Sequence, residues 1–188
     1  MTVTHHGQGR FTAWMQQPRP TVSAYDRPEE LLEVLGLPPS RLPVLTYDAG
    51  IAHVYITAPS VEAVTALRPD FAALRAIVGR HRINVFAPEG PGRVTTRMFS
   101  TFDTALPEDP ARGSAAGSLT AHLVRHGLHD SGAELTLSQG ESGQRQPLLP
   151  SASAFVSTMV AVPHHPSHAL IDRWVLKAPH SRDSYGCS

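Results

Sequence analysis

The sequence predicts an α+β fold in which a mixed sheet wraps around a central helix as a half-barrel. One long apolar helix is expected over residues 115–126, with Leu119 and Leu123 on its inward face. Segments with the side-chain alternation of strands lie on both sides of this helix in the chain, at 51–56 and at 133–139. A single helix flanked in sequence by several strands favours a curved sheet that closes around it.

Composition supports one folded unit. A chain of 188 residues allows one domain or one and a fraction, and 41% hydrophobic residues can supply a buried core. The 16 basic and 16 acidic side chains cancel, so no nucleic-acid partner is expected. Cys187 is the single cysteine, which excludes an internal disulfide and fits a reducing compartment. The polar start and the lack of a membrane-length apolar run predict a cytoplasmic protein with no membrane partner.

The first elements are expected to be a strand and a helix. Residues 11–15 have strand character. Asp26 and Glu29 form a capping-box pattern with Pro28 in the first helical turn, and Gly36 can stop the helix.

The middle of the chain alternates strands with short helices. A strand pattern covers 42–58, and Ser60 and Asp70 each precede a short apolar helix that they can cap. Two further strands are expected at 83–87 and 94–99. With the strand at 11–15, this order places four strands before the long helix.

The stretch 108–117 contains an acidic pair, a proline turn and the start of the long helix. Pro110 biases Asp109 away from the helical region of backbone space. Gly113 can adopt backbone angles closed to other residues, and Ser114 can cap the helix that follows. A capped helix after a proline turn, with no ligand, would account for these features on its own.

The same stretch is also a candidate anion site. A helix N-terminus carries unpaired N–H groups and the positive end of a dipole. A carboxylate or phosphate would therefore be stabilised over Gly113, Ser114 and Ala115. Asp109 beside it can accept a hydrogen bond from a substrate ammonium or hydroxyl group. No Gly stands two residues before or after Ser114, so a nucleophile elbow is excluded.

A longer pattern extends from this stretch. The chain has Glu108-Asp109-Pro110-Ala111-x-Gly113-Ser114-Ala115-x-Gly117-x-Leu119, then Ala121-x-Leu123 and Gly127. This pattern resembles the signature of the PhzF-like phenazine-biosynthesis proteins, which are cofactor-free isomerases with the diaminopimelate epimerase fold. The resemblance covers roughly Trp14 to Gly143 and implies a diaminopimelate epimerase-like half-barrel with no cofactor.

The resemblance implies an isomerase or epimerase that moves a proton on a small amino- or hydroxy-carboxylate in biosynthesis, in a cleft between two similar halves. Asp109, Gly113, Ser114 and Ala115 would hold the substrate. The family takes its acid/base residue from the first half, as a glutamate or in some members a cysteine. No segment of this chain matches that part, so the catalytic residue stays unknown, and Cys187 does not replace it on motif grounds.

This interpretation divides the chain into three parts. Residues 1–40 would be a remnant of the first half with the connecting helix, and 41–143 the second-half epimerase-like domain. Residues 144–188 would be a divergent or frame-shifted tail, expected to pack poorly, because Gln144-Arg145-Gln146-Pro147 stands where the family has Gly-Arg-Pro-Ser. Within the tail, strands remain possible near 155–162 and 174–176.

Two alternatives to an active isomerase stay open. The chain could be a noncatalytic carboxylate-binding half-domain, such as a truncated fragment or a subunit completed by a first-half chain, or a product with no stable fold. A homodimer is equally compatible with the sequence.

The eleven histidines do not predict a metal site. His164, His165 and His168 can bind Zn or Ni weakly, but no Cys or carboxylate lies nearby at ligand spacing. We expect His53 to be a packed or edge histidine rather than a catalyst. His122 and His126 are expected nearer the edge of the long helix.

Overall fold

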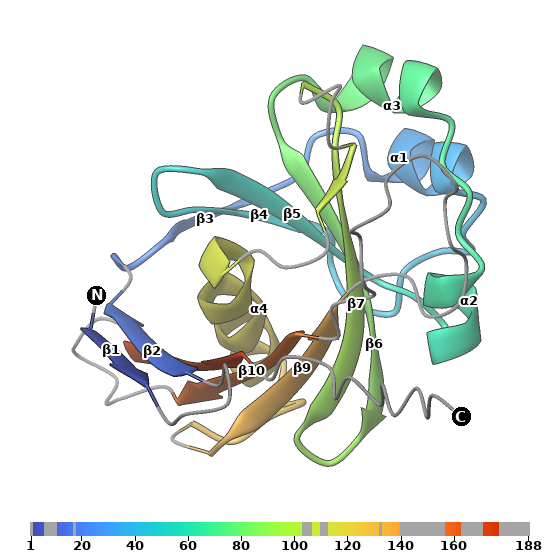
Figure 1. Ribbon diagram of the computed structural model, residues 1–188. Coiled ribbons are helices and arrows are strands. Elements are labelled where there is room, and N and C mark those ends of the chain that lie inside the picture. The colour runs from blue at the N-terminus through green and yellow to red at the C-terminus, as the bar shows by residue number, and fades with distance from the viewer. Residues whose placement is uncertain are drawn as a thin grey trace, which may run out of the picture.

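Figure 1 shows a computed structural model of the chain, in which four helices and eleven strands are described. The structure describes residues 2–5, 11–16, 18–102, 107–109, 113–131, 133–139, 157–162 and 171–176. The helices are α1 (Pro28–Leu35), α2 (Val61–Thr65), α3 (Phe71–Val78) and α4 (Gly113–Arg125). The strands are β1 (Thr2–His5), β2 (Phe11–Gln16), β3 (Thr21–Ala24), β4 (Leu45–Asp48), β5 (Ala52–Thr57), β6 (Arg82–Gly90), β7 (Arg93–Ser100), β8 (Glu108–Asp109), β9 (Leu135–Gln139), β10 (Ser157–Val162) and β11 (Ile171–Leu176).

All of these strands belong to one mixed sheet. Its order is β1-β2-β11-β10-β9-β7-β6-β5-β4-β3, and β8 pairs with β7 off this path. The β5–β6 and β7–β9 pairs are parallel and the remaining pairs are antiparallel. The predicted α+β class with a mixed sheet is confirmed.

The sheet curves around α4, while α1, α2 and α3 lie on its outer side (Figure 1). Helix α4 contacts β5 on one side of the curve and β10 and β11 on the other. This is the central helix within a half-barrel that the sequence predicts.

Each face of the sheet carries its own hydrophobic core. The inner core packs α4 against the concave face, through Tyr47, Tyr55, Phe86, Val94, Ala116, Leu119, Leu123, Leu135 and Leu137. The outer core lies between the convex face and the three short helices, and includes Leu31, Leu74 and Phe99. Because successive strand residues point to opposite faces, β5 contributes Tyr55 to the inner core and Val54 to the outer one. Five of the six residues of β5 are buried, as expected for a strand that is covered on both faces.

The short helices have the caps that the sequence predicts at two of three positions. The side chain of Ser60 accepts a hydrogen bond from Ala63 N (3.2 Å) and begins α2. Asp70 Oδ1 accepts from Ala72 N (2.8 Å) and Ala73 N (3.1 Å) and begins α3.

The capping box predicted at Asp26 is wrong. Helix α1 begins at Pro28, so Arg27 occupies the capping position and makes no side-chain cap. Arg27 instead donates to Glu30 on the helix surface (Nε–Oε1 2.8 Å). The proline sets the helix start one residue later than the box requires. Gly36 ends the helix in the left-handed conformation (φ 66°), as predicted.

The ends of the chain contribute strands to the same sheet. β10 and β11 lie within 144–188, near the predicted strands, and they fill the sheet between β9 and β2. The other residues of that tail lie outside the described residues, and the proposed division at 40 and 143 stays a prediction. In the described part of the chain, no helix has both the length and the apolar character needed to cross a bilayer.

Candidate functional site

The predicted anion site lies where β8 leads into α4. β8 is paired with β7 through Met98 opposite Asp109 and Phe99 opposite Glu108. The side chain of Asp109 and residues 110–112 lie outside the described residues, and so does the prediction that this aspartate faces a substrate. Gly113 is the first residue of α4.

Ser114 does not cap α4, which corrects the sequence prediction. The helix already includes Gly113, so Ser114 stands in its first turn. Its half-buried hydroxyl lies instead beside the sheet, with Oγ 3.3 Å from Nε2 of His53 on β5. Because Gly113 is already helical, the capping position lies before it and Ser114 falls inside the helix.

Asn84 determines which nitrogen of His53 carries the proton. Asn84 and His53 are each 1% exposed, and Asn84 Nδ2 lies 3.1 Å from His53 Nδ1. The same Nδ2 lies 3.4 Å from both Val54 O and Arg82 O. Because carbonyl oxygens only accept, Nδ2 is the amide NH₂ group, and Nδ1 of His53 accepts its hydrogen bond.

In its neutral form, His53 therefore carries its proton on Nε2 and donates it toward Ser114 Oγ. Ser114 accepts this bond with a lone pair, which leaves its own hydroxyl proton able to donate elsewhere. A hydroxyl with this orientation adds a donor to the N–H groups at the start of α4. The arrangement is suited to an anionic ligand.

Tyr55, two residues after His53 on β5, contacts the same helical turn. Its hydroxyl donates to Ala115 O at 2.7 Å, and Ala115 is 6% exposed. His53 and Tyr55 lie two residues apart on one strand, so both side chains extend from the concave face. The first turn of α4 is thus fixed to β5 at two consecutive residues.

Behind this contact, the rings of Tyr55, Tyr47 and Phe86 pack around His122 of α4. His122, on α4, stacks on Tyr55 with ring centroids 5.8 Å apart, and Tyr47 and Phe86 meet His122 edge-on at 5.5 and 5.7 Å. His122 is 0% exposed, so the expectation that it lies near the helix edge is wrong. The sheet closes over both sides of α4, which leaves this position no solvent edge.

Burial sets the charge state of this cluster. Desolvation, followed by the charges of His126 and Arg125, lowers the pKa of His122 to about 4. Burial also raises the pKa of Tyr47, whose hydroxyl lies 3.3 Å from His122 Nδ1. Both side chains are therefore neutral at pH 7, and the core behind α4 adds no charge to the site.

No group of three or more metal-ligating side chains occurs within the residues that the structure describes. His164, His165 and His168 lie outside them.

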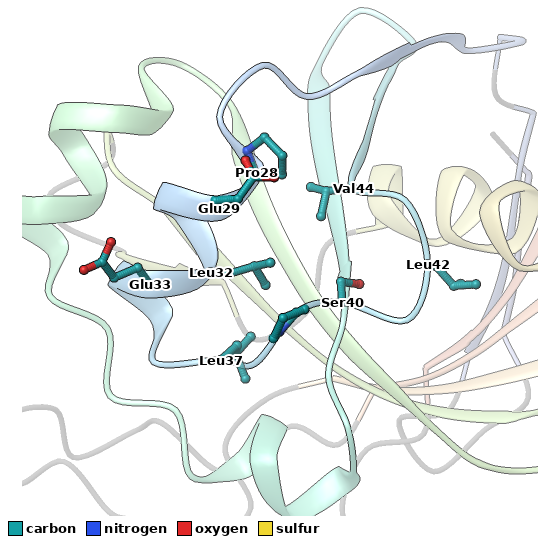
Figure 2. A pocket seen from close by; sticks show the side chains of 9 residues that line it. Pro28, Glu29, Leu32, Glu33, Leu37, Ser40, Leu42 and Val44 are labelled. Carbon is teal, nitrogen blue, oxygen red and sulfur yellow. The ribbon is translucent and has the colours of Figure 1, made fainter.

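A groove beside α1 is separate from the start of α4. It has a volume of about 380 Å³ and is lined by Pro28, Glu29, Leu32, Glu33, Leu37, Pro39, Ser40, Leu42 and Val44. Figure 2 shows Leu32 directed into this groove from α1, whereas the carboxylate of Glu33 points away from it. None of the lining residues belongs to β8 or α4, so this groove does not contain the predicted substrate residues.

Three contact residues of the candidate site were not predicted as such. His53 was expected to be packed, which it is, but its contact with Ser114 was not foreseen. Asn84 and Tyr55 were assigned only to strands. One local signal was present: a polar amide in an otherwise apolar strand has to find a hydrogen-bond partner when it is buried.

A family profile with the description "Phenazine biosynthesis-like protein" (PhzC-PhzF) matches residues 1–157. A trans-2,3-dihydro-3-hydroxyanthranilate isomerase from Pseudomonas chlororaphis is 43% identical over 128 residues, 68% of this chain and 45% of the relative. The isomerase of the same name from Pseudomonas aeruginosa is 43% identical over 127 residues, 67% of this chain and 44% of the relative. The chain therefore spans less than half the length of either relative.

Solved structures share the fold at lower identity. A Bacillus anthracis phenazine biosynthesis protein of the PhzF family superimposes with a TM-score of 0.66 at 18% identity, over 93% of this chain and 62% of that one. A predicted epimerase from Pseudomonas aeruginosa superimposes with a TM-score of 0.63 at 23% identity, over 93% of this chain and 60% of that one.

Proposed function

Because the chain belongs to the PhzC-PhzF family of phenazine biosynthesis-like proteins, we propose that it holds the substrate of an isomerase that shifts a proton on a small amino- or hydroxy-carboxylate. The observation that carries this proposal is the first turn of α4, fixed by His53 and Tyr55 with its N-terminus at Gly113. The relatives named as isomerases of a hydroxyanthranilate derivative support an amino-carboxylate as the substrate class.

The substrate carboxylate would bind the N–H groups of Gly113, Ser114 and Ala115. These groups lie at the positive end of the α4 dipole, and charge-assisted hydrogen bonds contribute about 1.5–3 kcal/mol each. The Ser114 hydroxyl, which accepts from His53 Nε2–H, would donate its proton to the same carboxylate. Asp109 would accept from the amino or hydroxyl group of the substrate.

Proton transfer itself would need a further acid/base group. The Pseudomonas relatives are more than twice as long as the region that matches this chain, and we infer that the acid/base group comes from outside that region. General acid/base catalysis contributes typically 10²–10⁴-fold, which substrate binding alone does not replace. We propose that a first-half chain, or a second copy of this chain, completes the site in the cytoplasm.

A noncatalytic carboxylate-binding half-domain is the second candidate function. It is favoured by the matched share of 45% of the first relative, since binding geometry and the acid/base residue would then lie in different parts of a longer protein. The two candidates differ in a single measurable property, proton exchange on the bound ligand.

The deciding experiment is proton exchange into a candidate amino-carboxylate in deuterated water, followed by NMR. We expect the chain alone to bind the ligand and to exchange its protons little, and a first-half polypeptide to raise the exchange rate if the two assemble. Ser114→Ala should weaken binding, whereas Ser40→Ala, in the separate groove, should not. Rapid exchange by the chain alone would show that a residue of this chain is the base. Absence of binding would refute the proposed site.

A further inference from the structure

Arg97 on β7 is a buried cation at the outer core. The residue is 2% exposed, and its guanidinium lies over the ring of Phe99 at 5.1 Å. A cation so far removed from water is costly unless every donor finds an acceptor. The partners of Arg97 therefore show which elements this side chain connects.

The first partner is the carboxylate of Glu108 on β8. Arg97 Nε donates to Oε1 and Nη2 donates to Oε2, each at 2.7 Å, which is the two-bond geometry of a guanidinium and a carboxylate. Only Arg provides these two parallel donors, because a lysine ammonium is a point charge. The pair thus fixes the orientation of Glu108 as well as its distance from β7.

The second set of partners is the C-terminal end of α2. Arg97 Nη1 donates to Leu67 O at 2.9 Å, Val64 O at 3.2 Å and Thr65 O at 3.3 Å. The last carbonyls of a helix lack partners within it and attract a positive charge. One side chain therefore joins α2, β7 and β8.

Among the described residues, few other contacts hold β8 in place. It is two residues long and lies off the main path of the sheet, paired with β7 alone. One backbone hydrogen bond, from Ser100 N to Pro107 O at 2.8 Å, holds the residue that precedes β8. The residue directly after Glu108 is Asp109, and α4 begins four residues later, at Gly113.

We propose that Arg97 and Glu108 are positioning residues of the substrate site. Their ion pair sets the place of β8, and with it the backbone of Asp109, without touching the ligand. The proposal rests on the proposed function for the identity of that ligand. A purely structural pair would change the stability of the whole chain, whereas a positioning pair changes ligand affinity and the local opening of β8.

Two variants test the pair separately. Arg97→Lys keeps the positive charge and loses the two-bond geometry, and Glu108→Gln keeps the size of the side chain and loses its charge. The probe is 3-hydroxyanthranilate, which carries amino, hydroxyl and carboxylate groups on one ring, and its Kd is measured by calorimetry. We expect binding about tenfold weaker in each variant, the effect of losing one charge-assisted interaction.

Two matched controls separate positioning from stability. Leu74→Ala removes a fully buried side chain of the outer core without touching β8, so it should lower stability and leave the Kd unchanged. Glu89→Gln breaks the pair of Arg93 with Glu89 (3.2 Å), which also involves β7 but is more exposed. Glu89→Gln should change neither the stability nor the Kd.

Amide hydrogen exchange supplies a readout that needs no ligand. In Arg97→Lys and Glu108→Gln, peptides covering 107–116 should exchange faster while peptides covering β6 keep the wild-type rate. Equal acceleration in both regions, or an unchanged rate at 107–116, would overturn the proposal. The proposal would also be overturned if Leu74→Ala raised the Kd as much as Glu108→Gln does. If the wild type binds no probe, the proposed function fails, and hydrogen exchange alone decides the role of the pair.

Discussion

His122 should make the stability of the chain depend on pH in a predictable direction. In the folded state the pKa of His122 is lowered to about 4 by burial, and then by His126 and Arg125, whereas an unfolded histidine has a pKa of about 6.5. Between these two values the unfolded state binds the proton and the folded state does not. Stability should therefore be intact above about pH 6.5 and fall as the pH drops toward about 4.

The magnitude follows from the difference between the two pKa values. Linkage gives a loss of about 2 kcal/mol between pH 7.5 and pH 5, and a limit of about 3 kcal/mol below pH 4. The group is fully buried, with Tyr47, Tyr55, Phe86 and His126 around its ring, so solvent does not screen the effect.

Urea unfolding of the wild type and of His122→Gln at pH 7.5 and pH 5 measures this effect. The other histidines titrate in both proteins, so the wild type should lose about 2 kcal/mol more than the variant between the two pH values. His129→Gln is the matched control, because His129 is only half-buried. Equal pH dependence in the wild type and His122→Gln would refute the assignment of His122 as a neutral buried residue.

Three further predictions concern α4 and its contacts with the sheet. Leu123→Ala, at a side chain 1% exposed in the inner core, should lower the free energy of unfolding by about 2–5 kcal/mol, and an unchanged urea midpoint would contradict that packing. Tyr55→Phe removes the hydroxyl that donates to Ala115 O and should cost about 0.5–1.5 kcal/mol of stability as well as weakening ligand binding, both compared with the wild type. Nitrogen NMR of the imidazole rings should find His53 with its proton on Nε2, and a proton on Nδ1 would disprove the orientation of Asn84.

The sequence predicted the elements that depend on local pattern. Helix α4 begins two residues before and ends one residue before the predicted range of 115–126, and its inward residues Leu119 and Leu123 are 2% and 1% exposed. Helical periodicity records which face of a helix is buried, so these positions need no tertiary information. The caps at Ser60 and Asp70 are equally local, because each side chain bonds a backbone group within three residues.

The contacts of the candidate site could not be predicted in the same way. His53 meets Asn84 because β5 and β6 pair in parallel, with His53 opposite Arg82, and it meets Ser114 because the sheet curves around α4. Partners 31 and 61 residues apart leave no local pattern. The prediction for His122 was wrong for a related reason, because the sheet covers the edge of α4 on which it lies.

The described contacts that support the proposed substrate site fall within one part of the chain, residues 53–115. His53 and Tyr55 fix the first turn of α4 from inside the sheet, and the Arg97–Glu108 pair fixes β8 from outside it. The inner supports are hydrogen bonds from His53 and Tyr55, and the outer one is a charge pair at the end of α2. Since these supports lie on opposite faces, loss of one leaves the other in place. If the first turn of α4 holds a carboxylate as proposed, these contacts would preorganise it from both faces of the sheet.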